Sequence, residues 1–205
     1  MNAFIVVLTL SFASLIPVLI ILLVAGVFDA LLFKYVQLIY DWRGYFRNSK
    51  FRKHNKDALG ISKIVEGLNV GSAYDARNID ALINNQITSI VNVCHVDTYH
   101  GEDIDGCMYI QLPLNDNYFN DYKTFKMAVD YTRANHNLGF NVLVHCVNGM
   151  NRSIGVAVAF LAVKLNISFE EAYGMIKEVR PFVKILSEPE SMAKRYIAEK
   201  QLSKS

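Results

Sequence analysis

Cysteine is scarce in this chain, and its spacing excludes two common roles. The 205 residues include three cysteines, Cys94, Cys107 and Cys146, and no two of them form a CxxC pair. The spacing therefore gives no support to a zinc site, and an odd number of cysteines does not predict a disulfide framework. Reduced thiols are typical of domains that face the cytosol. We expect a cytosolic folded domain that needs no metal and no cofactor.

Charged side chains are absent from a long N-terminal segment. They make up 20% of the chain, yet residues 3–28 contain none. A helix of that length spans roughly 39 Å, and the hydrocarbon core of a bilayer is about 30 Å thick. A cleaved signal peptide is the alternative, but it would have a basic start and a shorter apolar core. We expect a transmembrane helix within an anchor at residues 1–33, and Pro17 either kinks this helix or turns a re-entrant hairpin.

Basic side chains are missing before this segment and frequent after it. Positive charge marks the cytoplasmic side, so we expect a single-pass membrane protein whose C-terminal body is cytosolic. Residues 34–57 also interleave aromatic side chains with the cations, and this stretch either lies on anionic lipid or is a solvated linker. The basic side chains are Lys34, Arg43, Arg47, Lys50, Arg52, Lys53 and Lys56.

The remaining residues, 58–205, have the pattern of one α/β domain. Short β-branched or apolar runs predict buried strands, and segments with helical spacing and capping residues predict helices. Strands that alternate with helices predict a mainly parallel central sheet flanked by helices. The expected strands are 61–64, 68–70, 87–93, 108–112 and 141–145, and the expected helices are 72–84, 122–135, 152–165, 168–180 and 189–202.

The segment most informative about chemistry is HCVNGMNRS, from His145 to Ser153. It joins a predicted buried strand to a predicted helix, so loop amides and the helix N-terminus can form an anion-binding nest. Gly149 allows a backbone angle that other residues resist, and Arg152 brings a planar fork that can grip two phosphate oxygens. In this positive field the thiolate of Cys146 should be favoured, and it could attack a bound phosphorus atom.

The CX5R spacing alone occurs by chance, and a cysteine at a strand end is most often core packing. The fuller HCxxGxxRS string between an apolar strand and an apolar helix is more specific. Through it, the sequence resembles the small atypical dual-specificity phosphatases of the cysteine-dependent protein tyrosine phosphatase superfamily. The resemblance runs from about Ile61 to Tyr196 and includes three further stretches, ISKIVEGLNVGSAYDARN, ITSIVNV and ISFEEAYGMIKEVRP.

The resemblance implies a protein tyrosine phosphatase-like fold and a two-step reaction. Cys146 would attack phosphorus to form a cysteinyl-phosphate, while Arg152 and the loop amides hold the phosphate oxygens. Ser153 matches a hydroxyl that assists the thiolate and the breakdown of the intermediate, and His145 matches an imidazole that braces the loop. The implied phosphate-binding residues are Val147, Asn148, Gly149, Met150, Asn151 and Arg152.

A general acid is also needed to protonate the leaving oxygen. The resemblance implies an aspartate in the segment LPLNDNY at 112–118, where Asp116 is the match. Asp121 is a competitor, but it precedes a predicted helix, where a role as N-cap explains it. We therefore expect Asp116 to be the acid.

The substrate class is the least determined property. The leading hypothesis is hydrolysis of phosphotyrosine and phosphoserine or phosphothreonine in proteins. A phospholipid substrate is the alternative that the membrane anchor motivates, although polyphosphoinositide phosphatases usually carry lysines in this loop and residues 147–151 have none. A phosphate-reading module without turnover is disfavoured, because the nucleophile, the arginine and the acid are all present.

Asn151 departs from the serine that many relatives carry, and asparagine also occurs there in relatives that act on RNA 5′ ends. The globular part lacks an obvious basic and aromatic surface outside residues 34–57, and a membrane anchor fits RNA processing poorly. We therefore expect no nucleic-acid partner. The oligomeric state is left open by the sequence.

Overall fold

The computed structural model describes residues 35, 39, 60–98, 106–116 and 120–202. The chain divides into two units, Met1–Ile39 and Tyr40–Ser205, and every strand and helix named below belongs to the second. The predicted anchor at residues 1–33, with its uncharged segment 3–28, and the predicted domain boundaries near residues 33 and 57 lie outside the described residues, so they stay predictions.

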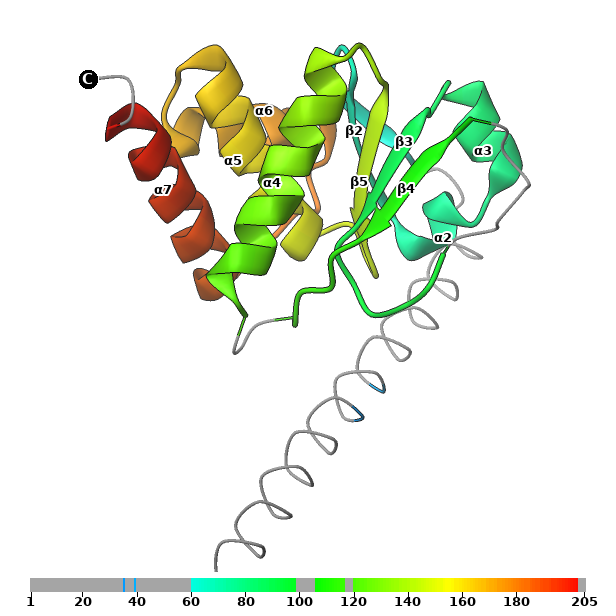
Figure 1. The fold of residues 1–205 in the computed structure, drawn as a ribbon, viewed down its shortest axis with the longest axis horizontal. Helices are drawn as coiled ribbons and strands as arrows, with labels where there is room; N and C mark the ends of the chain where they lie inside the picture. Colours follow the sequence, from blue (N-terminus) through cyan, green and yellow to red (C-terminus); the bar gives the residue numbers. More distant parts are fainter. Residues whose placement is uncertain (1–34, 36–38, 40–59, 99–105, 117–119, 203–205) are drawn as a thin grey trace, which may run out of the picture. The chain divides into compact units, whose positions relative to one another are not determined.

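A five-stranded sheet forms the centre of the domain (Figure 1). Its spatial order is β1-β2-β5-β3-β4, with parallel pairing of β2 with β5, β5 with β3, and β3 with β4, and antiparallel pairing of β1 with β2. The prediction of a mainly parallel sheet is therefore confirmed. The strands are β1 (Ser62–Val65), β2 (Leu68–Ser72), β3 (Ser89–Asn92), β4 (Met108–Gln111) and β5 (Val142–Cys146).

Helices cover both faces of this sheet, as predicted (Figure 1). On one face lie α4 (Tyr122–Asn137), α5 (Arg152–Leu165) and α6 (Phe169–Val179), with α7 (Ser187–Leu202) packed on α5. The short helices α2 (Ala73–Ala76) and α3 (Ile79–Asn84) lie on the other side of the sheet. Residues 152–162 of α5 are all buried, which makes α5 the central helix of the larger layer.

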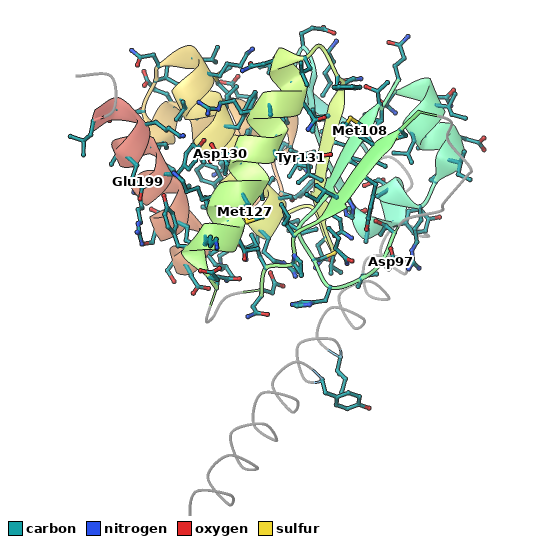
Figure 2. The ribbon with its side chains drawn as sticks, viewed as in Figure 1. Asp97, Met108, Met127, Asp130, Tyr131 and Glu199 are labelled. Atoms are coloured by element: carbon teal, nitrogen blue, oxygen red, sulfur yellow. The ribbon has the colours of Figure 1, made fainter. Side chains whose placement is uncertain are left out.

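Polar contacts join the outer helices α4 and α7. Figure 2 labels Asp130 of α4 and Glu199 of α7, whose carboxylates accept contacts from the facing helix. The hydroxyl of Tyr196 donates to Asp130 Oδ1 at 2.6 Å, and Lys126 Nζ lies 3.2 Å from Glu199 Oε2. Because Tyr196 is fully buried, its ring contributes apolar burial while its hydroxyl stays satisfied.

The caps confirm several predicted helix starts and correct one helix. Ser72 with Asp75, and Ser168 with Glu171, each form a complete capping box. The predicted helix at 72–84 is wrong as a single element, since it divides into α2 and α3. The cause is Asn78, which has an extended backbone and whose side chain accepts a hydrogen bond from the Ala81 amide, so it caps a second helix.

The central strand β5 determines where the chemistry of the domain lies. All five of its residues are buried, and its carboxyl end leads through residues 147–151 into α5. Ligands of open parallel sheets bind outside the carboxyl ends of the strands. Alternation along β5 sends Val142, Val144 and Cys146 toward the helical core and Leu143 toward the α2 and α3 side.

Among the described residues, no single helix has the length and apolar composition needed to cross a membrane. Helices α5 and α6, which meet at a bend of 118°, satisfy that requirement only when they are taken as a pair.

Candidate active site

The loop between β5 and α5 has its carbonyl groups turned outward. The carbonyl of Val147 accepts from the Ala73 amide at 3.2 Å, that of Gly149 from Arg180 Nε at 2.9 Å, and that of Met150 from the Lys184 amide at 3.0 Å. In a trans peptide the N–H opposes the C=O of the same unit. The amides of Asn148, Met150 and Asn151 therefore face the inside of the loop, as an anion nest requires.

Gly149 is required by the path of this loop. Its φ is +64°, in the left-handed region, and a Cβ there would collide with the carbonyl oxygen of Gly71 on β2. Any side chain would therefore force β2 and the loop apart, and it would also be strained by the backbone angle. The glycine of the predicted motif is explained by this close approach.

Cys146 lies at the base of the loop, with 2% of its surface exposed. Its Sγ is 3.4 Å from the Oγ of Ser153 in the first turn of α5. Burial by itself raises the pKa of this thiol, but the Arg152 guanidinium and hydrogen bonds from Ser153 outweigh burial and the repulsion from Asp116. The pKa of Cys146 consequently lies below its ordinary value, which favours the nucleophilic thiolate.

Arg152 and Asp116 contact each other, and the charges of both act on this thiol. Arg152 is 1% exposed, and its Nη1 donates to the carbonyl of Leu114 at 3.0 Å. Its Nε lies 3.2 Å from Asp116 Oδ1, and the Asp116 side chain is 43% exposed. The arginine is thus fixed by the loop that carries the acid, whereas the acid itself can be reached by a substrate from solvent.

Asn151 is the third side chain of this group. Its Nδ2 donates to Asp116 Oδ1 at 3.1 Å, and its Oδ1 accepts from the Leu186 amide at 2.8 Å. Asn151 is 8% exposed. The sequence implied only a backbone role for Asn151 in phosphate binding, and the structure adds the contacts of its side chain with Asp116 and Leu186.

His145 precedes the loop and contacts both Thr98 and the backbone of Cys146. It is fully buried, its Nε2 is 3.0 Å from Thr98 Oγ1, and its Nδ1 is 3.4 Å from the carbonyl oxygen of Cys146. Burial lowers the pKa of His145 to about 4, despite opposing effects of the Cys146 backbone and of Asp75. A neutral ring fits these contacts, since the Thr98 hydroxyl can donate to one nitrogen while the other donates to the carbonyl.

Asp121, the competing acid, lies at the start of α4. Its carboxylate accepts from the amides of Lys123 and Thr124 at 3.1 and 3.3 Å, and it is the N-cap of the helix. The hydrogen bond from the Lys123 amide is the main reason why the pKa of Asp121 is lowered. These contacts are those of a cap, in agreement with the expectation from sequence.

The loop that carries Asp116 is held at several points. The Asn115 amide donates to Asn120 Oδ1 at 2.6 Å, and the Asn120 amide donates to Glu188 of α7 at 3.1 Å. His95 Nε2 is 3.1 Å from Asn115 Oδ1. These contacts link the described residues on both sides of positions 117–119 to the segment after β3 and to α7, so the acid does not depend on Arg152 and Asn151 alone.

Sequence reasoning missed Arg180. This side chain is 3% exposed and binds the Gly149 carbonyl through Nε, and through Nη1 it binds the Gly60 carbonyl at 2.7 Å and Ser62 Oγ at 2.9 Å. It thereby joins the loop to the start of β1. The available signal was an arginine at the end of a predicted helix, directly before Pro181, but nothing local shows that such an arginine is buried.

Comparisons with known proteins agree with this geometry. The family described as "Dual specificity phosphatase, catalytic domain" matches residues 68–193. Dual specificity protein phosphatase 22-A of Danio rerio is 32% identical over 125 residues, which cover 60% of this chain and 59% of that protein. Dual specificity protein phosphatase 9 of Homo sapiens is 32% identical over 116 residues, which cover 56% of this chain and 30% of that protein.

The solved structures add evidence about the fold. The crystal structure of human DUSP28 has a TM-score of 0.63 at 24% sequence identity, and the match covers 70% of this chain and 99% of that one. The chain spans less than two thirds of the length of the two curated relatives. Because the family match covers more than half of the chain, the protein belongs to the family of dual specificity phosphatase catalytic domains.

Proposed function

We propose that this protein is a cysteine-dependent phosphatase that hydrolyses phosphomonoesters on proteins, at phosphotyrosine and at phosphoserine or phosphothreonine. The observation that carries the proposal is the meeting of three groups at one loop. The Cys146 thiol with its lowered pKa, the buried Arg152 and the partly exposed Asp116 supply a nucleophile, an anion ligand and a proton donor.

The first step is attack by the Cys146 thiolate on phosphorus. The S–P bond forms while the bond from phosphorus to the ester oxygen breaks, and Asp116 gives its proton to that oxygen. Arg152 and the inward-facing amides hold the other three oxygens, whose charge is spread in the transition state. A fixed set of donors stabilises that charge without reorganisation during the reaction.

The second step is hydrolysis of the cysteinyl-phosphate. Asp116, now ionised, takes a proton from water, the water oxygen bonds to phosphorus, and the thiolate leaves. The Ser153 hydroxyl, 3.4 Å from Sγ, stabilises the departing thiolate by donating to it. Phosphate and the protonated acid are left, and the enzyme is ready for the next turnover.

A protein substrate is favoured over a polyphosphoinositide by the interior of the loop. The side chains of Val147, Asn148 and Met150 carry no charge, so Arg152 is the loop's only cationic side chain. One such fork suits a single phosphomonoester. A headgroup with several phosphates would need further cations at this position.

We also propose that residues 3–28 anchor the enzyme in a membrane, with residues 58–205 in the cytosol. The apolar segment and the basic residues that follow it support this arrangement. In cells, the full chain should resist extraction by alkaline carbonate, and intact vesicles should leave the catalytic domain open to added protease. Release by carbonate, or protection of the domain, would count against the anchor or its orientation.

The function itself is tested with the full chain in detergent. Hydrolysis of an aryl phosphate should be lost in Cys146→Ser and retained in Cys107→Ser, which changes a half-buried cysteine outside the loop. Both variants should keep the wild-type circular dichroism spectrum. Wild-type turnover in Cys146→Ser would show that the mechanism is wrong.

The substrate class needs a second comparison. Rates on phosphopeptides should exceed rates on phosphoinositide vesicles, and Cys146→Ser held in its membrane should trap phosphoproteins. Faster turnover on phosphoinositide vesicles would indicate that the substrate is a lipid and not a protein. Tight phosphopeptide binding without release of phosphate by the wild type would indicate a binding module.

A further inference from the structure

Asn151 has a side chain that its local position does not explain. It is the N-cap residue of α5, and asparagine is among the best N-caps, yet its side chain makes no capping hydrogen bond. Its two polar atoms bind Asp116 and the amide of Leu186 instead. The Asn151 side chain therefore leaves the first amides of α5 open to the Cys146 thiolate and to a bound phosphate, and it is itself directed to the acid.

The orientation of the Asn151 amide is determined by its second partner. The Leu186 backbone N–H can only donate, so the atom of Asn151 that faces it, 2.8 Å away, must be the carbonyl oxygen. The NH₂ group then points to Asp116 Oδ1 at 3.1 Å. A flipped amide would place two donors against each other at Leu186 and lose both hydrogen bonds.

We propose that Asn151 is a positioning residue for the general acid Asp116, and this rests on the proposed function. Asn151 and its neighbour Arg152 both contact Oδ1 of Asp116, at 3.1 and 3.2 Å. Oδ1 can accept the hydrogen bond from Asn151 and stay beside Arg152 whether the acid is protonated or ionised, so the transferable proton is carried by Oδ2. The two side chains thus turn Oδ2 toward the ester oxygen that receives the proton.

The link to Leu186 makes the position of the acid depend on the segment between α6 and α7. The same segment reaches the loop through Lys184, whose amide donates to the Met150 carbonyl at 3.0 Å. Asn151 is only 8% exposed, so both of its hydrogen bonds are largely protected from competing water. The Asn151 amide thus connects the loop after β5 to Asp116 and to Leu186, which are distant from it in sequence.

The sharpest test is the dependence of the rate on the leaving group. Asn151→Ala and Asn151→Ser should slow hydrolysis of phenyl phosphate, whose phenol has a pKa of about 10, by roughly tenfold to a hundredfold. The same variants should slow the hydrolysis of 4-nitrophenyl phosphate by a clearly smaller factor, because a good leaving group needs little protonation. In an Asp116→Asn background, Asn151→Ala should have no further effect on phenyl phosphate.

Asn78→Ala is the matched control, because Asn78 is also an N-cap asparagine but bonds the Ala81 amide of α3. It should lower the free energy of unfolding by about 1 kcal/mol and leave both rates unchanged. If Asn151→Ala slows both substrates equally, or slows the Asp116→Asn enzyme as much as the wild type, Asn151 serves phosphate binding and the proposal is wrong. An unchanged rate on phenyl phosphate would also overturn it.

Asn151→Asp gives a second, independent readout. A carboxylate beside Asp116 disfavours its ionised form by repulsion, so the alkaline limb of the kcat profile should move to higher pH. A profile identical to that of the wild type would contradict the contact. If the wild type hydrolyses neither aryl phosphate, the proposed function fails and this role falls with it; if the wild type is active and only the leaving-group pattern is absent, the proposed function stands.

Discussion

Arg180 Nε donates to the carbonyl oxygen of Gly149 at 2.9 Å, so a residue at the end of α6 holds the phosphate loop at the position where the backbone is left-handed. The same guanidinium reaches the Gly60 carbonyl and Ser62. The loop is therefore held in shape by a buried charge in addition to its own sequence.

Arg180→Lys should destabilise the domain and weaken phosphate binding. Lysine has no planar fork and cannot make the three contacts together, so we expect a loss of about 2–4 kcal/mol in the free energy of unfolding. Urea unfolding and inhibition by inorganic phosphate measure the two effects. Arg133→Lys is the control, because its ion pair with Asp130 at 3.6 Å is partly exposed and should contribute less than about 1 kcal/mol. Equal losses of stability and of phosphate inhibition in the two variants would show that Arg180 does not hold the loop in shape.

Asp116→Asn should slow hydrolysis of phenyl phosphate by about a hundredfold or more, because the leaving oxygen loses its proton donor. Asp121→Asn should keep the rate, since asparagine also caps a helix. Steady-state kinetics on matched preparations compare the two. If Asp121→Asn lost most of the hydrolysis rate and Asp116→Asn kept the wild-type rate, Asp121 would be the general acid.

Ser153→Ala should raise the pKa of the Cys146 thiol, because a hydrogen bond to the thiolate is removed. At pH 6, labelling of Cys146 by iodoacetamide should become slower, and mass spectrometry can follow it. Cys107 is an internal control, since burial raises the pKa of its thiol and it lies outside the loop. An unchanged pH profile of Cys146 labelling would exclude this role for Ser153.

His145 should make the stability of the domain depend on pH. Its pKa falls from 6.5 in the unfolded chain to about 4 in the folded one, so between these values the unfolded state binds the extra proton. The free energy of unfolding should be highest above pH 6.5 and fall by up to about 3 kcal/mol as the pH drops to 4.

Urea unfolding of the full chain in detergent at pH 7 and pH 5 measures this dependence. In His145→Gln the difference between the two pH values should shrink, whereas His136→Gln, which retains His145, should keep it. If both variants keep the wild-type difference, another group is responsible.

Local sequence was sufficient for features that depend on neighbouring residues. The strand, loop and helix from Val142 to Leu165 follow from an apolar run, a glycine and a helical pattern, and the caps at Ser72 and Ser168 follow from short-range hydrogen bonds. Asn78 shows the limit of this reasoning. Its capping competes with helix continuation over a few residues, and the apolar spacing alone did not reveal the break.

The tertiary structure decided how distant segments complete the site. Nothing near Arg152 in the sequence shows that it binds Leu114 and Asp116, and the contact of His145 with Thr98 spans 47 positions. Arg180 and Leu186 reach the loop only because α5 and α6 fold back on the sheet. The spacing of Cys146 and Arg152 by itself determined a nucleophile beside an anion nest, since both belong to one turn; the position of the acid and the bracing of the loop required long-range packing, because their partners meet only in the folded chain.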